Sequence, residues 1–81
     1  MKASVKVFAL ARQLAGQDQI QVDLPDGATV AQLRRAIAEQ HPALAELARR
    51  ALFAIDSDYA REDTPLAPGA DLACIPPVSG G

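Results

Sequence analysis

The sequence predicts an α+β domain in which a mixed sheet of about five strands carries one main helix on one face. Three observations support this class. Apolar and polar residues alternate near the start of the chain, an apolar stripe of helical period follows, and short apolar segments separated by proline and turn residues fill the remainder. With 81 residues, of which 49% are hydrophobic, the chain is long enough for one small core and for no second domain.

The first third of the sequence predicts two strands joined by a short helical turn. Residues 3–10 and 19–24 both alternate apolar with polar side chains, the period of two of a half-buried strand. Residues 11–16 between them end in glycine, which is typical of a helical turn. Pro25-Asp26-Gly27 then predicts a turn into the next element.

The middle of the sequence predicts the main helix. Thr29 and Gln32 have the spacing of a capping box, so the helix should start at residue 30. It should end by His41, because Pro42 disfavours helical geometry in the residue before it. Residues 42–50 can form a second helix after a bend, since proline is tolerated in the first turn of a helix.

The last third predicts further strands. Residues 52–55 form a short apolar run expected to be a central strand, residues 59–61 a short edge strand, and residues 71–75 a last strand that Pro76-Pro77 stops. This order favours a β-grasp arrangement. A split ferredoxin-like fold needs a second long helix, which the proline-rich loop over 56–70 cannot supply.

We therefore expect a β-grasp domain over residues 1–76 and a flexible tail over residues 77–81. No apolar run is long enough for a signal peptide or a membrane span. The single Cys74 cannot form an internal disulfide, which is typical of a reducing compartment, so a cytoplasmic location is expected. The net charge of −2 argues against a nucleic-acid partner, because phosphate binding needs a basic face.

Few residues could carry catalysis within this chain. His41 precedes a proline at a helix junction, where a solvated or capping role is expected. Cys74 lies in a strand, where it should behave as a small buried hydrophobe, and no Cys/His cluster predicts a metal site. Asp56 and Asp58 lie in a turn and should shape its backbone.

The last six residues of the sequence combine prolines with glycines. Pro76 and Pro77 give a stiff exit from the last strand, and Gly80 and Gly81 carry the free carboxylate without side chains. A chain without Cβ atoms can enter a narrow site where larger residues do not fit. The ending therefore predicts a carboxylate that is delivered into another protein.

The chain resembles the small subunit of molybdopterin synthase, a ubiquitin-like sulfur carrier. The resemblance rests on the segments FALARQLAG at residues 8–16 and TVAQL at 29–33, on Pro65-Leu66 and PGADL at 68–72, and on the terminal PPVSGG. Asp56, where asparagine is expected in many relatives, and Cys74, where a larger apolar residue is commoner, depart from that family's pattern.

The resemblance implies a carrier that is not catalytic alone. An ATP-using, ubiquitin-activator-like enzyme would adenylate the Gly81 carboxylate, and a sulfur donor protein would convert it to a thiocarboxylate. The tail, with Gly80 and Ser79 threaded, would enter the large synthase subunit and give sulfur to cyclic pyranopterin monophosphate. The expected complex contains two small and two large subunits; no bound cofactor and no membrane partner are expected.

An apolar patch formed by Phe8, Leu66, Pro77 and Val78 is expected to dock these partners. Three alternatives remain from the sequence. The chain could serve thiamine synthesis, cysteine synthesis or tRNA thiolation, it could be a ubiquitin-like modifier joined to lysines, or it could be an interaction module with an inert tail.

Overall fold

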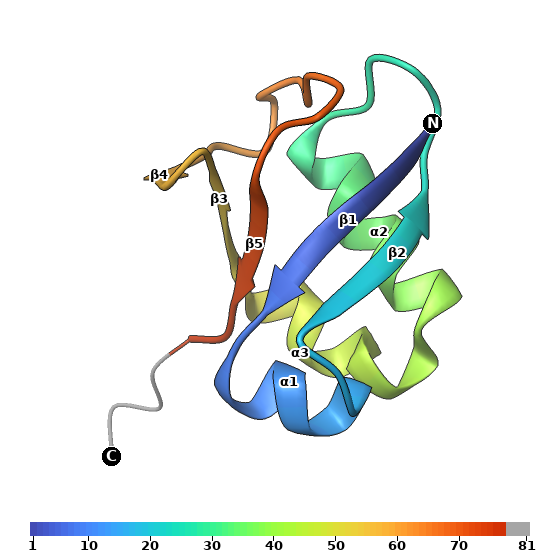
Figure 1. Ribbon diagram of the computed structural model, residues 1–81, viewed down its shortest axis with the longest axis vertical. Coiled ribbons are helices and arrows are strands. Elements are labelled where there is room, and N and C mark those ends of the chain that lie inside the picture. The colour runs from blue at the N-terminus through green and yellow to red at the C-terminus, as the bar shows by residue number, and fades with distance from the viewer. Residues whose placement is uncertain (78–81) are drawn as a thin grey trace.

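The structure is a computed structural model that describes residues 1–77, and it is a five-stranded mixed sheet with its helices on one face (Figure 1). In chain order the elements are β1 (Lys2–Val7), α1 (Ala9–Ala15), β2 (Gln19–Asp23), α2 (Val30–Gln40), the 3-10 turn η1 (Pro42–Leu44), α3 (Ala45–Arg50), β3 (Leu52–Ile55), β4 (Asp58–Tyr59) and β5 (Leu72–Ile75). The strand order across the sheet is β2-β1-β5-β3-β4. The predicted α+β class with one main helix is confirmed.

β1 and β2 form an antiparallel pair whose buried residues alternate with exposed ones, as the sequence predicts. The predicted first strand over 3–10 is too long, because β1 ends at Val7. The carbonyl oxygen of Phe8 accepts from the N–H groups of Ala11 and Arg12, so the chain enters α1 at Ala9. The expected single helical turn is therefore a helix of 7 residues.

α2 begins with the predicted capping box. The Gln32 N–H donates to Thr29 Oγ1 at 3.4 Å, and the Thr29 N–H donates to Gln32 Oε1 at 2.9 Å. The helix packs Val30, Leu33 and Ile37 against the sheet, where all three are buried. It ends at Gln40, and the expected single helix over 42–50 is divided into η1 and α3.

β5 lies in the centre of the sheet, parallel to β1 and antiparallel to β3. Residues 52–55 form an interior strand, as expected, because β3 lies between β5 and the short edge strand β4. Leu52 is exposed on one face of β3 and Phe53 is buried on the other. The strand is therefore half-buried, although its sequence is entirely apolar.

The core lies between the sheet and the helices. Its largest fully buried side chains, each less than 2% exposed, are Val5, Val7, Ile20, Val22, Val30, Leu33, Ile37, Leu44 and Cys74. Leu66 joins the same cluster, because its loop is fixed beside the start of α2 by a hydrogen bond from the Leu66 N–H to Ala28 O and by a bridge between Thr29 and Pro65.

Arg34 on α2 ties several elements together. Its Nη1 donates to the carbonyls of Ala48 and Ala51 at 2.7 and 2.6 Å, where the end of α3 leaves backbone acceptors without helical partners. Its Nε and Nη2 donate to both carboxylate oxygens of Glu62. The guanidinium also lies 4.9 Å from the ring centre of Phe53. One side chain thus joins α2 to α3, β3 and the loop before β5.

Candidate functional site

The candidate site surrounds the point where the chain leaves β5. Pro76 is half-buried, Pro77 is exposed, and neither has a backbone N–H with which to continue the strand. Because β1 and β5 are parallel, both strands end at the same edge of the domain. The register pairs Val7 with Cys74, so the next residues, Phe8 and Ile75, are neighbours at this edge.

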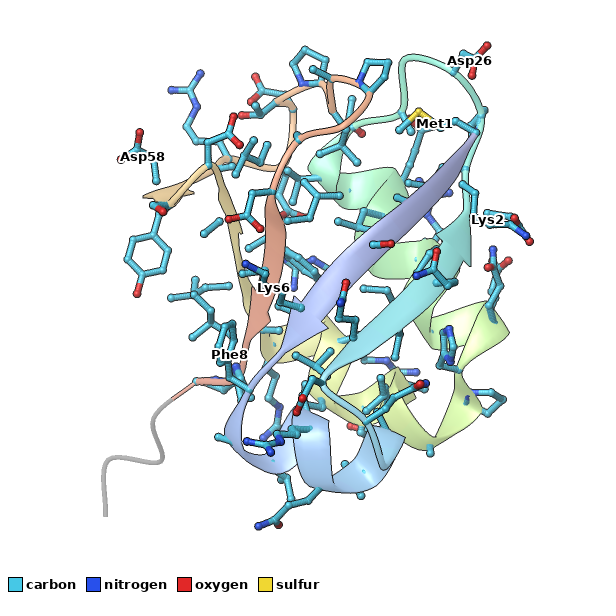
Figure 2. The ribbon with its side chains drawn as sticks, viewed as in Figure 1. Met1, Lys2, Lys6, Phe8, Asp26 and Asp58 are labelled. Carbon is cyan, nitrogen blue, oxygen red and sulfur yellow. The ribbon has the colours of Figure 1, made fainter. Side chains whose placement is uncertain are left out.

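Phe8 therefore lies beside the exit. Figure 2 shows it next to the end of β5, and 47% of the residue is exposed. The predicted patch also included Pro77, which the structure places on the surface. Val78, predicted with them, lies outside the described residues.

Leu66 corrects that predicted patch. It is only 3% exposed and belongs to the core, so it does not offer a surface to a partner in this structure. The sequence places Leu66 in a loop between two prolines, which suggests exposure. The backbone bonds that hold this loop against α2 are formed with residues 28 and 29, far away in the sequence.

Three further apolar side chains share the outer face of the sheet with Phe8. Leu52 is opposite Ile75 in the β3–β5 register, and Tyr59 is opposite Ala54 in the β3–β4 register. Leu52 and Tyr59 are 52% and 69% exposed. We name Phe8, Leu52, Tyr59 and Ile75 the exit surface. The sequence did not reveal Leu52 and Ile75, because both lie in apolar runs in which no polar residue marks the exposed face.

A groove adjoins the exit on the helical side. The exposed Leu10 and Leu14 of α1, Leu47 of α3 and the two prolines line it, and Glu46 and Arg50 contribute its charged groups. The residues that lead into the tail therefore have apolar neighbours both on the exit surface and in this groove. Surface clusters of this kind are typical of protein docking sites.

Two exposed ion pairs lie near the exit. Lys6 Nζ lies 3.2 Å from an oxygen of Asp71, and Arg12 Nε lies 2.7 Å from an oxygen of Asp18. Such exposed pairs add little stability, and because each joins one cation to one carboxylate it has no net charge to attract a partner over long distances. Arg61 pairs with Asp63 at 3.6 Å.

The described residues hold no catalytic group at the exit. Cys74 is 1% exposed, and burial raises the pKa of its thiol to about 11, so it lacks the thiolate that reacts with electrophiles. His41 is engaged elsewhere, with its Nε2 2.8 Å from the carbonyl oxygen of Gln21. Asp56 Oδ1 accepts from the Asp71 N–H at 3.0 Å in the turn between β3 and β4, which agrees with the predicted backbone role.

Within residues 1–77 the structure brings together no group of three or more His, Cys, Asp or Glu side chains that could hold a metal ion. None of the helices in this part of the chain is long and apolar enough to cross a membrane. Gly81, Gly80 and Ser79, to which the sequence assigns the chemistry, lie outside the described residues. What the structure shows is the base from which they extend.

The ThiS family profile matches residues 5–81. The chain belongs to the ThiS family. The chain is also 36% identical to the molybdopterin synthase sulfur carrier subunit of Chlamydomonas reinhardtii, with 100% of both chains covered. It is 38% identical to the subunit of the same name from Caenorhabditis briggsae, with 96% and 98% covered.

A solved structure extends this comparison. The crystal structure of SAMP1, small archaeal modifier protein 1 of Haloferax volcanii, is 30% identical over 100% of both chains and has a TM-score of 0.81. The β-grasp fold, the resemblance to the small subunit of molybdopterin synthase and the sulfur carrier function predicted from it are confirmed by these relatives.

Proposed function

We propose that this chain carries sulfur on the carboxylate of Gly81 as a subunit of a molybdopterin synthase. The observation that carries the proposal is the full-length match to sulfur carrier subunits, in a fold whose central strand runs directly into the Pro-Pro-Val-Ser-Gly-Gly ending. A tail attached to the centre of a sheet has a rigid base. The point from which the tail leaves the domain is therefore fixed relative to the exit surface.

The chemistry needs an activated carbonyl. A carboxylate is a poor electrophile, so attack of a Gly81 oxygen on the α-phosphate of ATP would first form an acyl-adenylate and release pyrophosphate. The outer sulfur of a donor persulfide would then displace AMP and form an acyl disulfide. A second donor thiol would cleave its S–S bond, forming a disulfide with the first donor thiol and leaving a thiocarboxylate on Gly81. That sulfur would be passed to cyclic pyranopterin monophosphate in the large synthase subunit, which would supply the substrate pocket and the acid–base residues.

The described residues support this division of labour. The thiol of Cys74 is buried and has a raised pKa, so the chain offers the sulfur donor no competing thiolate. The exit surface and the neighbouring groove offer apolar area for docking to the activating enzyme and to the large subunit. A complex of two small and two large subunits is the assembly we propose.

Intact-mass spectrometry tests the proposal. The purified chain is incubated with the activating enzyme, ATP and a sulfur donor, and the mass should rise by the exchange of one oxygen for sulfur, localised to Gly81. A variant that lacks Gly81 is the control and should not change in mass. An unchanged wild-type mass with an activating enzyme that demonstrably forms adenylate would contradict the carrier role.

The docking role of the exit surface has its own test. Phe8→Ala should weaken binding to the large subunit by about tenfold or more, because exposed aromatic residues often dominate interface energy. Glu39→Ala, an exposed change on α2, should leave the affinity unchanged. Equal affinities for both variants would remove Phe8 from the interface.

A second candidate function is attachment to other proteins, as the name of SAMP1 indicates for that relative. The same acyl-adenylate would then react with a lysine amine instead of a sulfur donor. Mass spectrometry of cell extracts distinguishes the two functions. Isopeptide bonds between Gly81 and lysines of other proteins would support modification. A thiocarboxylate without such adducts would support sulfur transfer alone.

A further inference from the structure

β2 is an edge strand, and its outward backbone groups can be identified from its pairing with β1. The Leu24 N–H donates to Met1 O, and the Val7 N–H donates to Asp18 O, so the even-numbered residues of this segment bond to β1. In an antiparallel ladder the alternate residues point their N–H and C=O groups away. Gln19, Gln21 and Asp23 therefore present their backbone groups at the edge.

Side chains at the end of α2 form hydrogen bonds with half of these outward-pointing N–H and C=O groups. Gln40 Oε1 accepts from the Asp23 N–H at 2.8 Å, and Gln40 Nε2 donates to Asp23 O at 2.9 Å. The side-chain amide thus replaces the peptide group that a neighbouring strand would supply. His41 Nε2 lies 2.8 Å from Gln21 O, and because a carbonyl oxygen only accepts, this ring nitrogen is the donor.

We propose that Gln40 and His41 close the β2 edge to strand addition, and that the partner they exclude is a second copy of this chain. An unpaired edge is a template for pairing with another strand, and proteins protect such edges by covering them. Here the cover consists of two side chains at the end of the helix that precedes η1. The inference concerns the edge opposite to β4 and does not depend on the sulfur carrier role.

A second β2 fits this edge because the strand is self-complementary about a two-fold axis at Gln21. In that antiparallel register Gln21 is opposite its own copy, and Gln19 is opposite Asp23 of the other chain. No two like charges are then directly opposed, so electrostatic repulsion across the strands does not prevent the pairing. The product would be one continuous sheet across both chains.

Hydrogen-bond counting explains why the cover is effective. The three opposed pairs would each exchange two backbone bonds, which makes six. Each copy would first lose the three bonds made by Gln40 and His41, which also makes six for two copies. Pairing of the intact protein therefore gains no hydrogen bonds. Removing the amide of Gln40 leaves only the His41 bond to be broken in each copy.

The test compares Gln40→Met with Glu39→Met by light scattering over a concentration series. The methionine at position 40 keeps the length of the side chain and removes both bonds to Asp23, whereas Glu39 is an exposed neighbour that bonds to none of these groups. The average mass of Gln40→Met should rise towards twice that of the wild type as concentration increases. Wild type and Glu39→Met should not change.

Two further measurements separate strand addition from a general loss of structure. Hydrogen exchange at the Gln19 and Gln21 amides of Gln40→Met should slow as concentration rises. Adding Gln21→Pro should restore the wild-type mass, because edge strands accept a proline whose missing N–H faces outward. His41→Ala, which removes one bond, is the second variant and should give a smaller rise in mass. Folded Gln40→Met and His41→Ala proteins that keep the wild-type mass at every concentration would overturn the proposal.

Discussion

Replacing Arg34 by methionine should destabilise the domain more than any other single change to a charged residue described above. Methionine keeps most of the apolar stem, and the two hydrogen bonds to the carbonyls of Ala48 and Ala51 are lost. Hydrogen bonds to a charged group contribute roughly 1.5–3 kcal/mol each. Because the Arg34 side chain is 22% exposed, we take the lower value for both, which gives about 3 kcal/mol.

The other contacts of Arg34 add less. Glu62 is 55% exposed, so its pair with Arg34 contributes about 0.5 kcal/mol. The stacking on Phe53 adds about 0.5 kcal/mol at such a partly exposed site, and methionine recovers part of that contact. In a domain of this size, 1 kcal/mol corresponds to about 4–8 °C in Tm, so the melting temperature should fall by more than about 10 °C.

Urea unfolding followed by far-ultraviolet circular dichroism measures the effect, since the chain has no tryptophan. The matched control is Arg35→Met, which removes the same charge from an exposed position of the same helix and should change stability by about 0.5 kcal/mol or less. Arg34→Lys keeps the charge but has one nitrogen atom where arginine uses three, so it should keep only part of these bonds, and its free energy of unfolding should lie between those of the two methionine variants. The reasoning would be refuted if the free energy of unfolding of Arg34→Met lay within about 1 kcal/mol of the wild-type value, with an unchanged denaturant slope.

The remaining predictions concern pH, the thiol and the helix cap. The hydrogen bond from Arg34 lowers the pKa of Glu62 below its ordinary 4.5. The ionised Glu62 therefore stabilises the folded state above that pH, and this stabilisation is lost as the pH falls through the native pKa. Glu62→Gln should weaken this acid dependence in urea titrations. Cys74 should resist alkylation in the native state and react once urea unfolds the chain, and rapid native labelling would contradict its burial. Thr29→Ala should reduce stability by about 1 kcal/mol through loss of the cap, and an unchanged melting curve would contradict that role.

Local sequence rules predicted most of the elements because each depends on neighbouring residues. The capping box at Thr29 and Gln32 fixes the start of α2, and Pro42 fixes its end, so both boundaries agree with the structure to within one residue. Strand alternation also predicted the half-buried β1 and β2. The error at residues 8–10 arose because alternation continues into α1, where the carbonyl of Phe8 already accepts helical bonds.

Contacts between distant residues escaped the same rules. Leu66 is buried because its loop bonds to Ala28, and nothing near Leu66 in the sequence indicates this. Arg34 reaches Glu62 at a separation of 28 residues, and Gln40 reaches Asp23 at a separation of 17. Pairings of this kind depend on how α2 lies across the sheet, which no local pattern encodes. Delivery of the terminal carboxylate was predicted from Gly80 and Gly81 themselves, whereas its adenylation and the transfer of sulfur were predicted only through resemblance.

The central position of β5 has a consequence for how the chain is made. β1 is synthesised first, yet one of its two neighbours in the sheet is the last strand, so the centre of the sheet cannot close until nearly the whole chain has left the ribosome. An incomplete chain lacks both this strand and the terminal glycines. The exit surface combines residues from β3, β4, β5 and the end of β1, so it is complete only once β5 has paired with β1 and β3.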